Sequence, residues 1–349
     1  MTFLTSDGNV YALSPPWNSP HPNSKATEIN FPEPIFEISA GSYHVVALSE
    51  MGRVYTFHHT DAEVQRVTFS FQTIDYYPGF LRPDEFGKVG GDIGLVRKVV
   101  GGGKRSAALI SGVGIVIWNS YNQGTGSRQA ATYQAGEHII SGTNYLENPP
   151  RDLPAETLNE LQRHRDIGQV LDFAMEEDYL LFVTTRGKVH AVTGLDNTRE
   201  PTRPPFQLYK FSSFEGNSIT RVTCGFRDFA VFNKDGLVHM GVKDMIYDAA
   251  SGKKEPQPPA NPDFTGHKVV DIAFGKFHGL ALTDKGEVLA WGCQYDGRYC
   301  CLGLGDNAAL LRCGATPIRR GLVKLTNPVV VPLGNPIHGI SDFHSPPIF

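Results

Sequence analysis

The segment DIAFGKFHGLALTDKGEVLAWG, residues 271–292, decides the fold, because a close copy of it, EISAGSYHVVALSEMGRVYTF, covers residues 37–57. In the later copy, apolar residues alternate with small or polar ones up to Gly275, which is the two-residue period of a β-strand. HGLALT follows as a second apolar strand, DKG as a hairpin turn whose glycine favours positive φ, and EVLAWG as a third strand. The segment therefore predicts three antiparallel strands joined by short turns.

The same pattern recurs along the chain. In four copies a glycine at the end of the first strand is followed eleven residues later by a turn glycine: Gly41 and Gly52, Gly103 and Gly114, Gly225 and Gly236, Gly275 and Gly286. A fifth copy has the turn glycine Gly187 with Glu176 in the first place, and a partial copy at the N-terminus has only its turn glycine, Gly8. The turn glycines are 44, 62, 73, 49 and 50 residues apart, so the cores are fixed and the spacers vary.

Short strands repeated at intervals of roughly 50–70 residues are typical of the blades of a β-propeller. We therefore expect an all-β chain, a propeller of four-stranded blades with six visible repeats, that forms one domain over residues 1–349. A fourth strand is expected within each spacer, as at residues 326–333. The repeat cores are expected at residues 1–13, 36–57, 97–119, 170–194, 219–241 and 269–292, with a partial core at residues 339–349.

The two ends of the chain carry complementary parts of a repeat. GISDFHSPPIF at residues 339–349 resembles the opening of a core, and the N-terminus supplies the latter part of one. Pairing of the two would make a composite blade and hide two sheet edges. Pro346 and Pro347 disfavour a fully paired strand. The alternative is that the chain is a shortened product that lacks a blade before Met1.

Composition excludes several classes of protein. The formal net charge is −4 and no basic run is visible, which argues against a nucleic-acid partner. No apolar stretch approaches the ~20 residues of a membrane span, and the N-terminus does not read as a signal peptide. Five cysteines without a C-x-x-C pair, four of them between Cys293 and Cys313, predict reduced thiols with no bound metal. These features favour an intracellular protein.

Residues 269–306 resemble the repeat of the regulator of chromosome condensation family. That repeat has a small residue and glycine, then His, an apolar strand, Asp-Gly, an aromatic-Gly pair and a GQLGLGD-like loop. The matching residues are Gly275, His278, Gly286, Trp291, Gly292, Leu302, Gly303, Leu304, Gly305 and Asp306. The copy at Gly41 keeps His44, whereas Ser106, Tyr179 and Asp228 take the histidine place in others. The family usually has seven blades, and six repeats are visible here.

The divergent repeats and proline-rich insertions look most like the propeller half of fungal F-box proteins of the Skp–cullin–F-box-associated factor type, without the F-box. This resemblance implies a non-enzymatic scaffold that binds a protein through its loops, in the cytoplasm, the nucleus or both, as the substrate-recognition part of a ubiquitin ligase. The alternative is the activity of the family's founding member, guanine-nucleotide exchange on a small GTPase, or a chromatin-associated role.

No residue is assigned to catalysis, to a cofactor or to a metal. His44 and His278 recur at one repeat position, which favours a structural hydrogen bond over catalysis. Trp118 and Trp291 end strands, where an aromatic ring covers packing between sheets. The glycine-rich residues 89–106 lack the spacing of a phosphate-binding loop, since Arg105 follows Gly103-Lys104.

Recognition is expected in the long spacers, because loops on a rigid scaffold carry most binding residues. The long spacers are residues 58–96, 120–168, 195–218 and 242–267. PAETLNELQRHRD, residues 154–166, reads as a short helix that either docks a partner or caps a blade. The proline-rich residues 14–34 read as an exposed loop, with Trp17 as a candidate contact.

Overall fold

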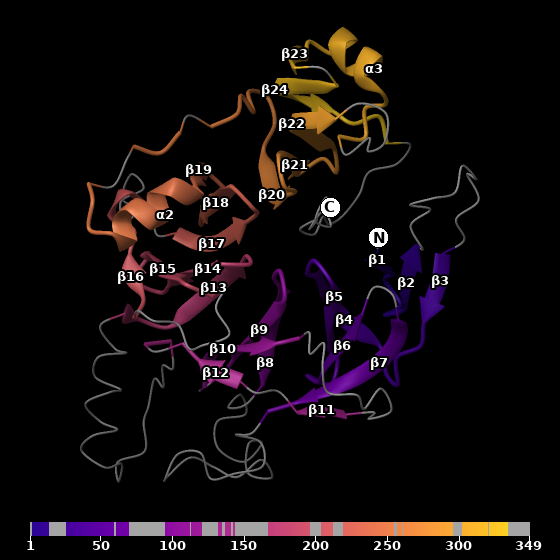
Figure 1. Cartoon of the computed structure of the whole chain (residues 1–349), viewed down its shortest axis with the longest axis vertical. Helices are drawn as coiled ribbons and strands as arrows, with labels where there is room; N and C mark the ends of the chain where they lie inside the picture. Colours follow the sequence, from indigo (N-terminus) through magenta and orange to yellow (C-terminus); the bar gives the residue numbers. More distant parts are fainter. Residues whose placement is uncertain are drawn as a thin grey trace. The chain divides into compact units, whose positions relative to one another are not determined.

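The computed structural model describes most of the chain (Figure 1). The described residues are 2–13, 26–58, 61–69, 95–111, 113–120, 132–134, 137–140, 142–143, 167–195, 204–211, 219–254, 257–259, 261–295, 302–319 and 321–333. Their strands form six sheets, and the fold is an all-β propeller with six blades, as the repeats predicted. Contacts divide the chain into two compact units, with blades 1–3 in one and blades 4–6 in the other. The single domain over residues 1–349 stays a prediction.

The first unit holds blades of three, five and four strands. Blade 1 consists of β1 (Thr2–Leu4), β2 (Val10–Leu13) and β3 (Ala26–Ile29). Blade 2 consists of β4 (Ile35–Ala40), β5 (His44–Ser49), β6 (Val54–His58) and β7 (Asp61–Thr68), with β11 (Thr132–Gln134) added parallel to β7. Blade 3 consists of β8 (Val96–Gly101), β9 (Arg105–Ile110), β10 (Gly114–Asn119) and β12 (Glu137–Ile139).

The second unit holds blades of four, three and five strands, coloured from pink to yellow in Figure 1. Blade 4 consists of β13 (Val170–Met175), β14 (Tyr179–Thr184), β15 (Val189–Thr193) and β16 (Phe206–Gln207). Blade 5 consists of β17 (Ile219–Cys224), β18 (Asp228–Asn233) and β19 (Val238–Val242). Blade 6 consists of β20 (Val269–Phe274), β21 (His278–Thr283), β22 (Val288–Tyr295), β24 (Leu322–Val330) and β23 (Thr316–Arg319).

Three short helical segments accompany the strands of the second unit: a 3-10 turn, η3 (Tyr209–Phe211), and the helices α2 (Lys243–Ala250) and α3 (Asn307–Arg312). Asp306 caps α3, since its side chain accepts a 2.8 Å hydrogen bond from the Ala309 backbone N–H. The strand expected at residues 326–333 is β24, which begins earlier, at Leu322, because Leu322–Leu325 pair with the end of β22.

The hairpin turns follow the glycine pattern of the sequence. In each turn the glycine N–H bonds to the carbonyl three residues earlier, as in Gly52 to Ser49 at 2.9 Å and Gly286 to Thr283 at 3.0 Å. L side chains rarely adopt the positive φ that these turns require, which explains the recurrence of glycine. The positive φ values are 81° at Gly8, 75° at Gly52, 67° at Gly187, 80° at Gly236 and 76° at Gly286.

In blade 3 the predicted alignment is wrong by one residue. The bond that Gly41 N–H makes to the His44 carbonyl is made there by Gly102 N–H to the Arg105 carbonyl, at 2.8 Å in both blades. Gly102, not Gly103, is therefore the counterpart of Gly41, and Arg105 rather than Ser106 takes the histidine place. Val113 correspondingly makes the bond of the turn glycine, and Gly114 follows it with a φ of 101°. Three consecutive glycines, 101–103, conceal this register in the sequence.

The first strand of every blade from 2 to 6 contains a bulge at the same place. The register with the second strand shifts across one residue, between Ile35 and Glu37 in blade 2 and between Val170 and Asp172 in blade 4. The extra residue bends the strand and interrupts the regular alternation of side chains between the two faces of the sheet. The bulged residues are Phe36, Arg97, Leu171, Thr220 and Val270.

A charged residue follows each bulge, and three of these residues bond to the next blade. The Glu37 carboxylate accepts a hydrogen bond from the Val99 N–H at 3.4 Å, and the Asp172 carboxylate accepts one from the Val222 N–H at 2.9 Å. Arg221 of blade 5 donates to the Val270 carbonyl and lies 3.4 Å from the Asp271 carboxylate. Neighbouring blades within each unit are thus linked by polar groups as well as by apolar packing.

Glycine also ends the first strand where two blades approach each other. A Cβ on Gly41 would lie 2.1 Å from the Gly102 carbonyl oxygen, and a Cβ on Gly225 would lie 2.3 Å from the Phe274 Cβ. Real Cβ atoms do not approach other atoms so closely. The backbone at these two glycines therefore packs directly against the next blade, which no other residue allows.

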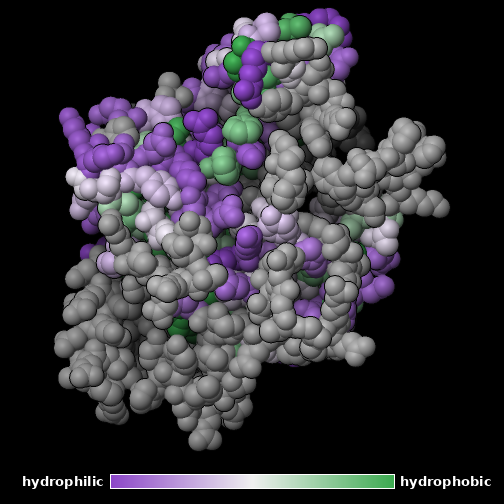
Figure 2. All heavy atoms as spheres, in the orientation of Figure 1, coloured by the Kyte–Doolittle hydropathy of each residue, from purple (hydrophilic) through white to green (hydrophobic). Residues whose placement is uncertain are grey.

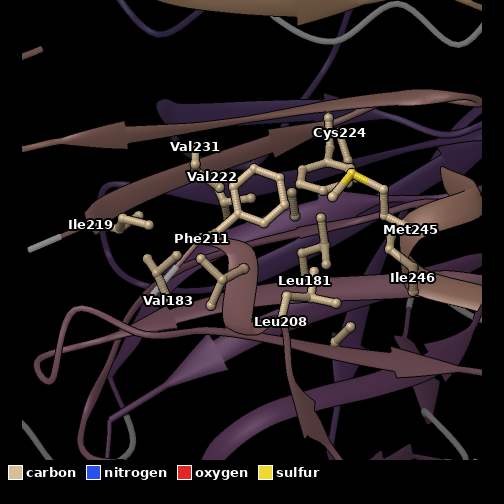
Figure 3. Close-up of a cluster of buried hydrophobic side chains, with 14 of the residues drawn as sticks. Leu181, Val183, Leu208, Phe211, Ile219, Val222, Cys224, Val231, Met245 and Ile246 are labelled. Carbon is tan, nitrogen blue, oxygen red and sulfur yellow. The ribbon is translucent and has the colours of Figure 1, made fainter. Parts of the chain in front are cut away.

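Apolar side chains fill the space between blades 4 and 5 (Figure 3). Leu181 and Val183 of blade 4 face Ile219, Val222 and Val231 of blade 5. Met245 and Ile246 extend from α2 into the same cluster and are fully buried. Burial of side chains of this size stabilises the fold by ~1.5–3 kcal/mol each. The helix is thereby fixed to both blades.

Blade 5 has no fourth strand among its described residues, and the side chain of Asn261 covers part of that edge. Its Oδ1 accepts from the Met240 N–H at 2.9 Å, and its Nδ2 donates to the Val238 carbonyl at 2.6 Å. The amide thus makes the two bonds that a neighbouring strand would make to β19. This protects a sheet edge from pairing with another chain.

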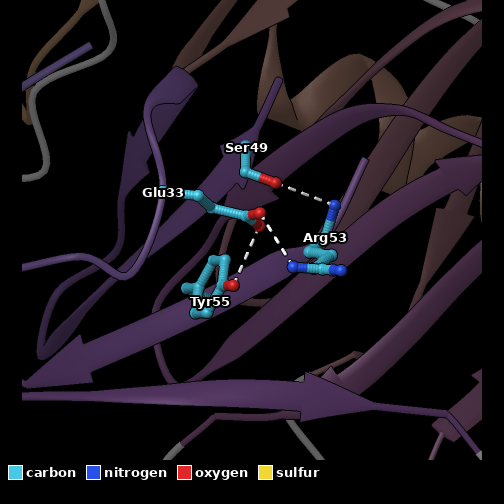
Figure 4. A network of polar contacts seen from close by, with 4 residues as sticks. All are labelled: Glu33, Ser49, Arg53 and Tyr55. Atoms are coloured by element: carbon cyan, nitrogen blue, oxygen red, sulfur yellow. Dashed lines mark hydrogen bonds and ion pairs between the residues drawn. The ribbon is translucent and has the colours of Figure 1, made fainter. Parts of the chain in front are cut away.

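A polar network fixes the segment before β4 to the β5–β6 hairpin (Figure 4). The Glu33 carboxylate accepts from the Tyr55 hydroxyl at 2.8 Å and from the Arg53 guanidinium at 2.9 Å. The Ser49 hydroxyl accepts from the Arg53 N–H at 3.0 Å. Burial acts to raise the pKa of Glu33, but the hydroxyls of Ser49 and Tyr55 and the charge of Arg53 hold it below its usual value.

The visible surface is mainly hydrophilic where it is coloured in Figure 2. Among the described residues, no helix is both long and apolar enough to span a membrane. The predicted partial core at residues 339–349, the helix at 154–166 and Trp17 all lie outside the described residues. The pairing of the two chain ends therefore stays a prediction.

Candidate interaction surface

Three equivalent loops of the second unit expose side chains between the first and second strands of their blades. Each loop is closed by one backbone bond: Glu176 N–H to the Tyr179 carbonyl, Gly225 N–H to the Asp228 carbonyl, and Gly275 N–H to the His278 carbonyl, at 2.8, 2.8 and 2.9 Å. Two residues remain at each tip. The tips are Glu177 and Asp178 in blade 4, Phe226 and Arg227 in blade 5, and Lys276 and Phe277 in blade 6.

The tips of blades 5 and 6 bring two aromatic rings together. The centroids of Phe226 and Phe277 are 6.2 Å apart with an interplanar angle of 73°, a T-shaped contact. The Lys276 ammonium lies 5.1 Å from the Phe226 centroid and 5.7 Å from the Phe277 centroid, within the range of cation–π attraction. Phe226 nevertheless remains 39% exposed, so this ring contributes an apolar contact surface.

Lys243, the first residue of α2, fixes the other side of Phe226. Its ammonium lies 5.3 Å from the Phe226 ring, 5.9 Å from the Tyr179 ring and 5.6 Å from the Tyr247 ring. The Asp178 carboxylate pairs with it at 2.5 Å and also accepts from the Tyr247 hydroxyl at 2.7 Å. A cation is unfavourable at a helix N-terminus, where the helix dipole is positive. The negative charge of Asp178 offsets this unfavourable interaction of Lys243.

These side chains border a shallow pocket of about 200 Å³, lined by Phe226, Arg227, Val242, Lys243 and Asp244. We call the surface formed by Asp178, Phe226, Arg227, Lys243, Lys276 and Phe277 the loop-tip surface. This surface combines an exposed aromatic ring, cationic groups and the shallow pocket. The loops that carry it are closed by the backbone hydrogen bonds described above. Such a combination is typical of a surface that binds another macromolecule.

The residues of the histidine position lie at the base of the loops and point toward neighbouring backbone. The Tyr179 hydroxyl donates a 2.6 Å hydrogen bond to the Gly225 carbonyl of the next blade, and burial raises the pKa of Tyr179 well above its usual value. In the first unit, His44 Nε2 lies 2.7 Å from the Ser106 hydroxyl of the next blade. Burial lowers the pKa of His278, whose ring covers Gly275.

Trp118 and Trp291 both lie in aromatic packing, but only Trp118 lies near the end of its strand, because β22 continues past Trp291 to Tyr295. Trp118 is 2% exposed and makes a T-shaped contact with Phe69, at 5.2 Å between centroids. Trp291 contacts Phe264 at 5.5 Å and covers Gly279, where a Cβ would meet its ring at 2.2 Å. Gly292, with a φ of 109°, lies against the backbone of His278.

Cysteines of the described residues do not gather into a metal-binding group with His, Asp or Glu. Cys224 is buried, Cys293 is partly exposed and Cys313 is exposed, all as free thiols, while Cys300 and Cys301 lie outside the described residues. Burial raises the pKa of the Cys293 thiol and that of the Asp228 carboxyl, and the charges of Arg227 and Lys324 act against both shifts.

Sequence reasoning placed recognition in the long spacers and did not identify the loop-tip surface. One spacer does contribute to it, through Lys243 at the start of α2. The available signal was the pair of residues between the first-strand glycine and the histidine position, which is charged or aromatic in blades 4–6. The pairing of Asp178 with Lys243 had no signal, because 65 residues separate them in the sequence.

Comparisons with known proteins agree with this architecture. The family model of the regulator of chromosome condensation (RCC1) repeat matches residues 269–298. The F-box protein pof9 of Schizosaccharomyces pombe is 25% identical over 313 residues, 88% of this chain and 54% of that protein. The E3 ubiquitin-protein ligase MYCBP2 of Danio rerio is 23% identical over 200 residues, 57% of this chain and 4% of that protein.

A solved structure shows the same fold over nearly the whole chain. Prp20p of Saccharomyces cerevisiae aligns with a TM-score of 0.53 and 14% identity, covering 95% of this chain and 75% of that one. The chain spans about half or less of the length of the two curated relatives above. The repeat match, the blade topology and this shared fold together support an RCC1-type propeller.

Proposed function

We propose that this propeller is a non-enzymatic protein-interaction scaffold and that it forms the substrate-recognition part of a ubiquitin ligase. The observation that carries the first half is the loop-tip surface. Phe226 is exposed there, although two ammonium groups and a second ring hold it in place. An aromatic side chain fixed before binding loses little entropy on contact with a partner, which favours affinity.

The second half rests on relatives. One relative that matches 88% of this chain is an F-box protein, and another is an E3 ubiquitin-protein ligase. The propeller would select the protein to be modified, and its ligase partners would supply the transfer chemistry. The protein would then act in the cytoplasm, the nucleus or both.

Affinity purification of the endogenous full-length protein tests the proposal. We expect a Skp-type adaptor and a cullin to co-purify, together with proteins that accumulate when the gene is deleted or the proteasome is inhibited. Recovery of neither ligase components nor proteins stabilised by deletion would contradict the ligase role.

Nucleotide exchange on a small GTPase is the competing function, implied by resemblance to the family's founding member. A nucleotide-release assay with the nuclear transport GTPase distinguishes the two. Acceleration of release by catalytic amounts of this chain would replace the scaffold proposal.

A further inference from the structure

The cations of the loop-tip surface are unequally neutralised. Lys243 is paired with Asp178 at 2.5 Å. Arg227 and Lys276 make no ion pair with any of the described residues, and Arg227 is exposed. Two positive charges beside one exposed ring are therefore available to an incoming group. A cation that is not already in an ion pair can form a charge-assisted hydrogen bond with an incoming carboxylate or phosphate.

The surface also has an apolar part next to these charges. Phe226 is adjacent to Arg227 in the chain, and the Lys276 ammonium lies 5.1 Å from its ring. Val242 and Phe226 contribute apolar atoms to the pocket, while Arg227 and Lys243 line it with positive charge. An acidic side chain that sits beside an apolar one in an extended segment would match both parts at once.

Acidic residues near the pocket weaken its attraction for an acidic ligand. Asp244 lines the same pocket and is exposed, and Glu177 is exposed at the tip of blade 4. Asp228 follows Arg227 in the chain, and the charge of Arg227 acts on its carboxyl, against the rise in pKa that burial causes. Asp244 therefore weakens the attraction for an acid inside the pocket, and its neutralisation should strengthen it.

We propose that the loop-tip surface binds an acidic linear segment of a partner protein, with an acidic side chain between Arg227 and Lys276 and a neighbouring apolar side chain on Phe226. This rests on the proposed scaffold function and specifies its ligand. The shared chemistry of the bound group is an anionic oxygen cluster, supplied by glutamate, aspartate or a phosphorylated serine.

Fluorescence anisotropy with the whole chain tests the inference. The probes are labelled short peptides that carry Phe beside one variable residue, which is Glu, phosphoserine, Gln or Lys. We expect the Glu or the phosphoserine peptide to bind at least roughly tenfold more tightly than the Gln peptide, and the comparison of the first two distinguishes carboxylate from phosphate. Binding should weaken as salt rises from about 50 to about 300 mM.

Charge variants locate the site. Arg227→Glu and Lys276→Glu should each weaken binding of the acidic peptide roughly fivefold or more, and Asp244→Asn should strengthen it. Lys285→Glu is the matched control, because Lys285 is exposed in the hairpin turn at the opposite end of β21. Circular dichroism and thermal melting show that each variant folds.

Equal affinity for the Glu, phosphoserine and Gln peptides, or binding that Arg227→Glu leaves unchanged, overturns the inference. The two proposals fail separately. A chain that recruits ligase components but does not discriminate acidic peptides refutes only the acidic segment. A chain that binds acidic peptides through Arg227 but recruits no ligase component refutes only the ligase role.

Discussion

The Asp172 carboxylate of one blade accepts a hydrogen bond from the Val222 N–H of the next blade, at 2.9 Å. Asp172 is 8% exposed and lies directly after the bulge of β13. A carboxylate that binds a backbone N–H between two sheets fixes their register as well as their distance. The equivalent contact of Glu37 with Val99 shows that this link recurs in the first unit.

Replacement of Asp172 by Ala should lower the free energy of unfolding by about 1–3 kcal/mol, because it leaves a buried N–H without its acceptor. Asp172→Asn should cost less, since its carbonyl oxygen can still accept. Urea denaturation measures both. Glu177→Ala, at an exposed position five residues along, is the control and should change little. An equal effect of Asp172→Ala and Glu177→Ala would contradict the role of the link.

Tyr179→Phe removes the hydroxyl that donates to the Gly225 carbonyl at 2.6 Å. We expect a loss of about 1–2 kcal/mol in the free energy of unfolding, because the buried Gly225 carbonyl loses this donor. The matched control is Tyr209→Phe, since Tyr209 is 72% exposed. Thermal unfolding of the two variants provides the comparison, and a Tm for Tyr179→Phe no lower than for Tyr209→Phe would be evidence against this bond.

Gly225 and Gly286 should respond differently to the same substitution. A Cβ at Gly225 would lie 2.3 Å from Phe274 Cβ, whereas Gly286 has a φ of 76° in a turn. Asparagine tolerates the left-handed region, so Gly286→Asn should cost under about 1 kcal/mol. Gly225→Asn should cost at least ~2 kcal/mol, because the side chain displaces a neighbouring blade. Chemical denaturation of both variants checks the order, and the reverse order would refute the close approach.

His190 should make stability depend on pH in mildly acidic solution. Burial, and then the charge of Lys188, lowers its pKa from 6.5 to about 4, while its ring stacks on Phe182 at 5.0 Å. The folded state therefore favours the neutral ring. The full contribution is present above pH ~6.5 and is lost as pH falls toward ~4, by on the order of 3 kcal/mol in total.

His190→Leu should flatten this part of the stability–pH profile, because leucine does not titrate. Urea denaturation at a series of pH values measures the slope. His267→Leu is a control, since His267 is also partly buried but lies beside a carboxylate, at 3.3 Å from Glu287. A His190→Leu profile as steep as that of the parent chain would show that another group titrates.

The sequence was sufficient for the hairpins and their number, because each requires glycine at one turn position and alternation on both sides. Gly52, Gly187, Gly236 and Gly286 all have the positive φ that the turns require. The sequence was insufficient where a residue other than glycine makes the hydrogen bond of the turn. Val113 makes the turn bond in blade 3, and the run of glycines before it fits two registers equally well.

Long-range relationships were also beyond the sequence. In the sequence, a charged residue after the bulge, such as Asp172 or Arg221, reads as ordinary polar alternation, and its contact with the next blade has no signal there. Likewise α2 and Asn261 occupy the outer side of blade 5, where the repeat predicted a fourth strand. The hydrophobic periodicity of a repeat cannot reveal that a side-chain amide makes the hydrogen bonds that a neighbouring strand would make.

The bulge in the first strand places two neighbouring residues under different constraints. The residue after it is charged in all five blades, whereas the bulged residues themselves, Phe36, Arg97, Leu171, Thr220 and Val270, have no chemistry in common. Assembly therefore constrains one position and leaves its neighbour open to mutation. Divergent descendants of such a chain can acquire new specificities at these five points while they keep the same framework, and a protein engineer could diversify them first.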